Sequence, residues 1–262
     1  MTQLASRRTP EEEELERKQA ELAGLQADLA QRELDLATLQ AELQAFELRY
    51  LRTVGAKLAQ LDELEARIAE LVVKLQPQDH QAQEQAQRAR AQARQSAQAS
   101  DAARESEDAD RFEAPAALKS LYRDVAKHIH PDLTTDQAER ERRTRVMAEA
   151  NAAYERGDAE ALEGILRQWQ SSPEGVKGEG IGAELIRTIR KLTQVRERLA
   201  AIESTIAELK ASPLYSLKSR VDEAQALGRD LLAEMAADLD GQIAERRQRL
   251  DLLKQREVFH ER

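Results

Sequence analysis

Apolar residues recur every seven positions along the first part of the chain. One row consists of Leu15, Leu22, Leu29, Leu36, Leu43 and Tyr50. A second row consists of Leu25, Leu39 and Phe46, with Arg32 interrupting it. Two rows with an average spacing of 3.5 residues predict a coiled-coil helix. We therefore expect an N-terminal coiled coil over residues 11–75.

The apolar row changes register near Gly55. The later apolar positions are displaced by four residues from the first row and comprise Val54, Leu61, Leu64, Ile68, Leu71 and Leu75. A four-residue insertion locally unwinds a supercoil, and glycine weakens a helix. The pattern leaves open whether the helix kinks or turns back there.

The apolar stripe disappears over residues 76–110, where Gln, Ala and Arg dominate and an acidic run follows. These residues favour helix but offer no apolar face, so we predict a polar helical spacer. Residues 171–182 contain Pro173 and four glycines, which indicates a linker.

A clean heptad pattern returns over residues 183–258. Its two rows are Leu185, Leu192, Leu199 and Ile206, and Val195, Ile202 and Leu209. Ser212-Pro213 interrupts the helix. Apolar positions at helical spacing then continue through Leu214, Leu217, Val221, Ala224, Leu231, Met235, Leu239, Ile243 and Leu250. We favour a C-terminal coiled-coil hairpin, with a kinked continuous helix as the alternative.

Composition agrees with an all-α fold. Aromatic residues make up 3% of the chain and charged residues 34%, with 10 glycines and 6 prolines among 262 residues. This is typical of long helices that bury apolar side chains along seams. The N-terminus has no signal-peptide run and no stretch is apolar enough to span a membrane, so we expect a cytoplasmic protein without a membrane partner.

Charge and residue types narrow the functional classes. The net charge of −9 argues against general binding to nucleic acid, and so does the acidic and non-aromatic setting of the arginines near Arg90. The absence of cysteine excludes a disulfide or a thiolate zinc site. His128 and His130 are two apart and face different sides of a helix, so we expect no metal. No phosphate loop or nucleophile elbow is present, and we expect neither a cofactor nor an enzyme.

The region 111–170 carries the non-repetitive pattern. An apolar helical stripe consists of Leu118, Leu121, Tyr122, Val125 and Ile129. A basic row at i, i+4, i+8 lies away from it and consists of Lys119, Arg123 and Lys127. Pro131 ends this helix, which leaves His130 at its end and Asp132 in the loop.

A second helix is expected after this loop. Thr134-Thr-Asp-Gln137 fits a capping box, and the helix continues through Met147, Ala150 and Tyr154 to Gly157 as its C′ residue. The two helices form an antiparallel pair whose loop begins with His-Pro-Asp. From its place in the loop, we expect His130 to contribute little to the core.

These residues resemble the J-domain of DnaJ-type co-chaperones. The second helix of that family follows a Tyr-Arg-x-Leu-Ala-x-x-x-His-Pro-Asp pattern, and the chain reads Tyr122-Arg-Asp-Val-Ala-Lys-His-Ile-His-Pro-Asp132. The family's third helix ends in Ile-Asn-x-Ala-Tyr, which Ala150-Asn-Ala-Ala-Tyr154 matches except at the first position. The aromatic-rich first helix has no counterpart beyond Phe112, and a short helix around Leu162 and Trp169 is a candidate to cover the pair instead.

The resemblance implies that His130, Pro131 and Asp132 engage a DnaK-type chaperone and promote its ATP hydrolysis. It also implies that Lys119, Arg123 and Lys127 meet an acidic surface of that partner. The first hypothesis is thus a co-chaperone or adaptor whose coiled coils form a homodimer and bind a client protein. The second is a coiled-coil scaffold in which the hairpin is a packing or protein-interaction element.

Overall fold

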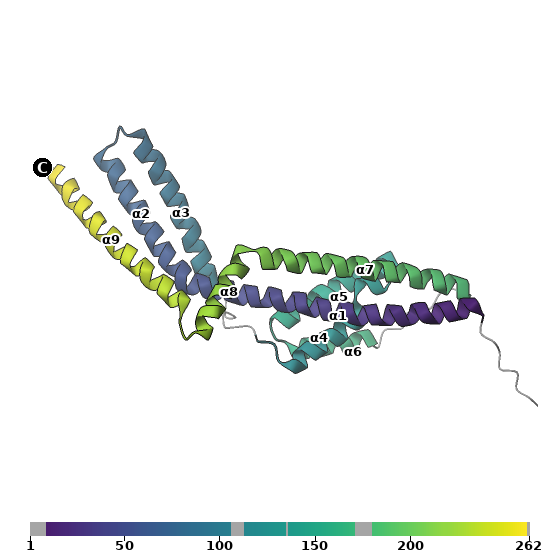
Figure 1. The fold of residues 1–262 in the computed structure, drawn as a ribbon. Helices are drawn as coiled ribbons and strands as arrows, with labels where there is room; N and C mark the ends of the chain where they lie inside the picture. The colour runs from purple at the N-terminus through teal and green to yellow at the C-terminus, as the bar shows by residue number, and fades with distance from the viewer. Residues whose placement is uncertain (1–8, 106–112, 135, 171–179, 261–262) are drawn as a thin grey trace, which may run out of the picture. The chain divides into compact units, whose positions relative to one another are not determined.

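The computed structural model describes residues 9–105, 113–134, 136–170 and 180–260, and every regular element in these ranges is helical (Figure 1). The predicted all-α class is confirmed. The elements are α1 (Pro10–Tyr50), the π-helical segment η1 (Leu51–Gly55), α2 (Ala56–Leu75), α3 (His80–Glu105), α4 (Ala116–Ile129), the 3-10 turn η2 (Pro131–Leu133), α5 (Gln137–Glu155), α6 (Ala159–Gln170), α7 (Ile181–Ala211), α8 (Pro213–Ala226) and α9 (Leu231–His260). None of the described helices is long and apolar enough to cross a membrane.

The first three elements follow one another without interruption as a 66-residue helix. The register change predicted near Gly55 is absorbed by η1, where the Ala56 N–H donates to the carbonyl of Leu51. A π turn adds a residue to the helix and so shifts the apolar row. Gly55 permits this because a Cβ there would lie 3.2 Å from the Leu51 side chain. The helix therefore neither stops nor reverses at this point.

The chain forms two compact units. Unit 1 comprises residues 1–42 and 112–212, and unit 2 comprises residues 43–111 and 213–262. The predicted N-terminal and C-terminal segments each contribute to both units, because α1 is divided between them and the C-terminal segment is divided at Pro213. Most of the predicted linker (171–179) and of the acidic run (106–110) lies outside the described residues, as does Phe112.

In unit 1 the first part of α1 packs against two partners, α7 on one face and the group of α4, α5 and α6 on another (Figure 1). One face packs on α7 through a buried cluster of Leu29, Leu36, Val195 and Ile202. The two helices run parallel, since both Gln19–Glu184 and Glu33–Arg198 hydrogen bonds join residues 165 positions apart. The other face of α1 packs on α4, α5 and α6 through Ala30, Leu34 and Ala37.

In unit 2 the helix α3 turns back after Leu75 and runs antiparallel to α2. Arg90 pairs with Glu63 at 2.7 Å, and Arg52 Nε donates to the carbonyl of Ala103 at 2.7 Å. Ala82, Ala93 and Ala103 are buried. The prediction that this stretch buries no face is therefore wrong, because alanines at helical spacing let two helix backbones approach closely without large apolar side chains.

The two apolar seams of the C-terminal segment pack on the long N-terminal helix. The hairpin predicted from the sequence, in which the two seams pack on each other, is therefore wrong. The break at Ser212-Pro213 lies where it was predicted, and α7 packs on α1 in unit 1. A further turn with Gly228 at φ 75° separates α8 from α9, and it was not predicted. In unit 2, α9 packs on α2 in a cluster that includes Leu61, Ile68, Leu239, Ile243 and Leu250.

The packing of α3 on α2 can be tested with two substitutions in α3. Ala93 is buried and Ala91 is exposed. We expect Ala93→Arg to lower the free energy of unfolding by about 1–3 kcal/mol, because overpacking forces the α2–α3 pair apart. Ala91→Arg, the matched control, should change it by less than about 0.5 kcal/mol. Urea unfolding measures both, and equal effects would show that α3 does not pack on α2.

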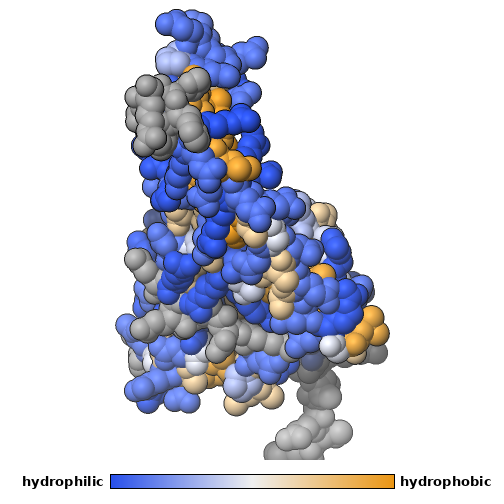
Figure 2. All heavy atoms as spheres, turned by 90° about the vertical axis from the view of Figure 1, so that its left-hand side faces the viewer, coloured by the Kyte–Doolittle hydropathy of each residue, from blue (hydrophilic) through white to orange (hydrophobic). Residues whose placement is uncertain are grey.

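The sequence predicts a homodimer through the coiled-coil seams, whereas the described seams pack on one another within one chain. Figure 2 shows a face that is largely hydrophilic. Among the described large apolar residues, Ile186 and Ile189 of α7 are 54% and 45% exposed. We expect a monomer by sedimentation velocity at micromolar concentration, since the seams among the described residues already have partners within the chain. A dimer that dissociates on Ile189→Gln would instead place self-association on this part of α7.

Candidate functional site

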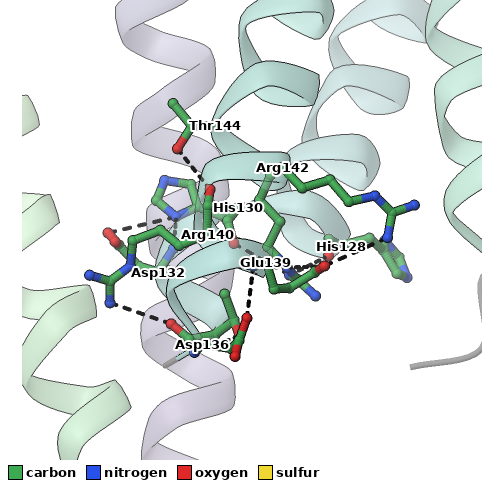
Figure 3. A network of polar contacts seen from close by, with 10 residues as sticks. His128, His130, Asp132, Asp136, Glu139, Arg140, Arg142 and Thr144 are labelled. Carbon is green, nitrogen blue, oxygen red and sulfur yellow. Dashed lines mark hydrogen bonds and ion pairs between the residues drawn. The ribbon is translucent and has the colours of Figure 1, made fainter. Parts of the chain in front are cut away.

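The His-Pro-Asp sequence forms the connection between α4 and α5. The N–H of His130 donates to the carbonyl of Ala126 at 3.1 Å and completes the last turn of α4. Pro131 begins η2, and the N–H of Asp132 donates to Nδ1 of His130 at 3.2 Å. Figure 3 shows His130 and Asp132 side by side in this connection, next to the start of α5. The loop is thus closed by a bond from its own backbone.

The second helix begins two residues later than the predicted capping box. The N-cap of α5 is Asp136, whose Oδ1 accepts from the N–H of Glu139 at 2.9 Å. Thr134 instead accepts from the N–H of Asp136 at 3.2 Å within the loop. At the other end Gly157 has φ 71°, and its N–H donates to the carbonyl of Tyr154 at 2.9 Å. This is the glycine-terminated helix end that was predicted.

The hairpin of α4, η2 and α5 has a tightly packed core. The apolar positions predicted on α4 and α5 are buried at Leu118, Tyr122, Val125, Ile129, Met147, Ala150 and Tyr154, with Leu121 partly buried. The Tyr122 hydroxyl donates to Oδ1 of Asn151 at 2.6 Å, and its ring lies 4.8 Å from that of Tyr154. Burial raises the pKa of Tyr122, so its hydroxyl stays a donor.

Two other helices cover this core. Helix α6 contributes Leu162, which is fully buried, and Trp169. The guanidinium carbons of Arg142 and Arg143 each lie 4.8 Å from the centre of the Trp169 ring. Helix α1 contributes the small apolar face described above, and the hydroxyls of Tyr154 and Thr38 lie 2.8 Å apart. The hairpin is therefore enclosed from both sides within unit 1.

His130 is buried, with 3% of its surface exposed, and so is Glu33 of α1. Their Nε2 and Oε1 atoms lie 2.8 Å apart. The same Oε1 accepts from Nε of Arg198 on α7 at 2.9 Å. The expectation that His130 contributes little to the core is therefore wrong. Its ring joins the hairpin to α1, and one carboxylate links α1, α7 and the loop.

The hydrogen bonds assign a tautomer to His130. Nδ1 accepts from the backbone of Asp132, so Nε2 carries the proton and donates to Glu33. Burial alone would raise the pKa of Glu33, but the hydrogen bond from His130 and the charge of Arg198 outweigh burial and lower it. Glu33 is therefore an ionised carboxylate whose Oε1 has two donor residues, His130 through Nε2 and Arg198 through both Nε and Nη2.

Arg143 of α5 also holds this loop, through backbone carbonyls. It is 5% exposed, and its Nη1 donates to the carbonyls of His128 and His130 at 3.2 and 3.4 Å. Its Nε also donates to Glu139 at 3.1 Å. A buried guanidinium thus satisfies carbonyls that the end of α4 leaves without helical partners.

The remaining predicted residues lie on the outside of the hairpin. Arg123 and Lys127 are exposed, and Lys119 is half-buried. Pro131 is half-buried, and the side chain of Asp132 is 22% exposed. Arg123 also donates to Gln31 of α1 at 3.2 Å. The structure therefore places the basic row and Asp132 where a partner can reach them, and His130 where it cannot.

The ring of His128 is exposed and its Nδ1 lies 2.6 Å from the carbonyl of Asp124, so it points away from His130. Over the described ranges, no three His, Asp or Glu side chains are grouped as metal ligands would be. The site is a set of hydrogen-bonding and charged side chains around one loop.

Glu33, Arg198 and Arg143 were missed in the sequence. Glu33 and Arg198 occupy the e and g positions beside the apolar rows of their helices, where charged pairs commonly join two coiled-coil helices. That signal predicts a pair somewhere along α1 and α7, but it does not select these two residues. Arg143 lies in an Arg-rich stretch with no distinguishing feature.

Comparisons with known proteins found no matching family model and no match among curated proteins or solved structures. The function is therefore argued from the geometry of the chain itself.

The buried carboxylate yields a pH-dependent prediction. We expect Glu33→Gln to lower the free energy of unfolding by about 1–3 kcal/mol at pH 7, because a hydrogen-bonded charge is lost. The folded pKa of Glu33 is lowered, so its contribution is complete above the unfolded pKa of about 4.3 and disappears as the pH falls through the folded pKa. The difference between the two proteins should therefore shrink in acid.

Asp35→Asn is the control, since the Asp35 side chain is 40% exposed and pairs with Arg32 on the same helix. An exposed ion pair contributes little to stability, so the urea midpoint of Asp35→Asn should hardly differ from that of the unmodified chain. A Glu33→Gln effect that stays constant between pH 7 and pH 3.5 would contradict the assignment of a lowered pKa.

Proposed function

We propose that this chain is a cytoplasmic J-domain-type co-chaperone or adaptor that recruits a DnaK-type chaperone and stimulates its ATPase. In this proposal the chain has no enzymatic activity of its own. The hairpin binds the chaperone, and the long helices position it and bind a client protein.

One observation carries the proposal. The two sequence patterns that resemble the family come together in one hairpin, in which Tyr122 of the first pattern donates to Asn151 of the second. Between them the chain passes through His130, Pro131 and Asp132 in a short connection. A chance tripeptide would not require its flanking residues to pack on one another in this order.

The distribution of charge on the chain also supports the proposed DnaK-type partner. The chain carries a net charge of −9, yet Arg123 and Lys127 are exposed one turn apart on α4. A local basic face on an acidic protein would orient an acidic partner and speed the encounter more than it would increase affinity.

A second function is favoured by the burial of His130. A histidine that bonds Glu33 at 2.8 Å in the interior serves packing, as the scaffold hypothesis requires. In that case the hairpin holds α1 and α7 together and no ATPase is stimulated.

ATPase stimulation distinguishes the two functions. We expect the purified full chain, in excess, to raise the single-turnover ATPase rate of a DnaK-type chaperone, and Asp132→Asn to abolish this effect. Asp132 is partly exposed, so the substitution should leave the fold intact by circular dichroism. Asp124→Asn is the matched control, because Asp124 is an exposed carboxylate on α4, and it should retain stimulation.

Stimulation that persists in Asp132→Asn would contradict the proposed role of the loop. If neither the unmodified chain nor Glu33→Ala, which removes the carboxylate bonded to His130, stimulates the chaperone, the scaffold is the function.

A further inference from the structure

The proposed partner-binding loop is closed in this structure. Only 3% of His130 is exposed, and its Nε2 atom is occupied by Glu33. Its other ring nitrogen accepts from Asp132 within the loop. A partner that needs the imidazole must therefore displace the bond to Glu33 first.

We propose that α1 and α7 hold the His-Pro-Asp loop in an autoinhibited state through Glu33, and that the chaperone binds productively only after His130 has left this carboxylate. This inference rests on the proposed function, since it describes how the same loop is regulated. The open state needs the hairpin to move away from α1 by enough to uncover one ring.

The chemistry of Glu33 supports a regulatory contact. The residue is enclosed between the apolar face of α1 that meets α7 and the face that meets the hairpin. An apolar side chain would fill such a position without the cost of burying a charge. A buried carboxylate instead needs its two hydrogen-bond donors, His130 and Arg198. If either donor moves away, the closed arrangement becomes less stable.

The rest of the interface between α1 and the hairpin suits separation. Apart from Glu33, the buried residues of α1 in this cluster are two alanines and one leucine, Ala30, Ala37 and Leu34. The larger part of the cluster, including Tyr122, Ile129, Met147 and Leu162, belongs to α4, α5 and α6. Opening would also break the contact between the Thr38 and Tyr154 hydroxyls, but it would leave the core that α4, α5 and α6 form with one another in place, as expected for a local opening.

The basic row is restrained by the same helix. Gln31 of α1, two residues before Glu33, accepts from Arg123 at 3.2 Å. Helix α1 thus contacts both parts of the proposed chaperone-binding surface, and its departure would free the imidazole and the guanidinium together.

Histidine reactivity tests the closed state without any chaperone. We would treat the full chain with diethyl pyrocarbonate and map the modified histidines by tandem mass spectrometry. His128, which is exposed, is the internal reference, and His130 should react far more slowly. In Glu33→Ala the rate of modification of His130 should rise at least about tenfold, because a charge-assisted bond is lost. The rate in Glu33→Gln should lie between those in the unmodified chain and in Glu33→Ala.

Asp28→Ala is the matched control, since it removes an exposed carboxylate five residues away on the same helix, and it should leave His130 protected. Circular dichroism and the emission of Trp169, the single tryptophan, check that the hairpin and α6 stay folded. Equal rates at His128 and His130 in the unmodified chain would overturn the closed state directly.

The ATPase assay then tests regulation. At equal subsaturating concentration, Glu33→Ala should stimulate the DnaK-type chaperone several-fold more than the unmodified chain or Asp28→Ala, and Asp132→Asn added to Glu33→Ala should abolish the gain. If the unmodified chain and Glu33→Ala stimulate equally, the inference fails and the proposed function stands. If neither stimulates although His130 has become reactive, the proposed function fails.

Discussion

A single buried carboxylate is the interaction on which unit 1 depends. Glu33 is 3% exposed and uses Oε1 for both His130 and Arg198. A buried charge is tolerated only when donors satisfy it, so the positions of α1, α7 and the loop constrain one another. The apolar clusters on either side of α1 supply most of the burial, but they would permit some sliding. The carboxylate selects one register, because its two donors come from different elements.

Local features of the hairpin could be read from the sequence, whereas its environment could not. The apolar stripe from Leu118 to Ile129 predicted a helix with one buried face, Pro131 predicted its end, and Gly157 predicted the end of the next helix. Each of these follows from neighbouring residues along the chain. The burial of His130 depends on a residue 97 positions earlier, and no local pattern specifies that distance. The capping residue was misplaced by two positions for a different reason, since Thr134, Thr135 and Asp136 are all acceptable caps and only the loop geometry selects among them.

For the long helices too, the sequence predicted which residues are buried but not which helices pack on one another. Heptads predicted that Leu29, Leu36, Val195 and Ile202 would be buried, and they are. They did not predict which seam packs on which, because rows of leucine are interchangeable partners. The alanines of α3 were missed altogether, since a search for large apolar residues overlooks helices that pack through small ones. The second face of α1, formed by Ala30, Leu34 and Ala37, escaped notice for the same reason, although its i, i+4, i+7 spacing is a recognisable signal.

The two functional hypotheses become two states of one molecule if the inference is correct. With His130 on Glu33 the hairpin acts as a packing element, and with His130 released it presents a loop to a partner. A partner that binds only the open state has its apparent affinity reduced by the open fraction, so an open population of about 1% would weaken binding about a hundredfold. The strength of one hydrogen-bonded contact would then set how strongly the chain acts as an adaptor. A client or second protein that pulls α1 or α7 away from the loop would raise activity without touching the His-Pro-Asp residues, which would couple the long helices to the small site that they enclose.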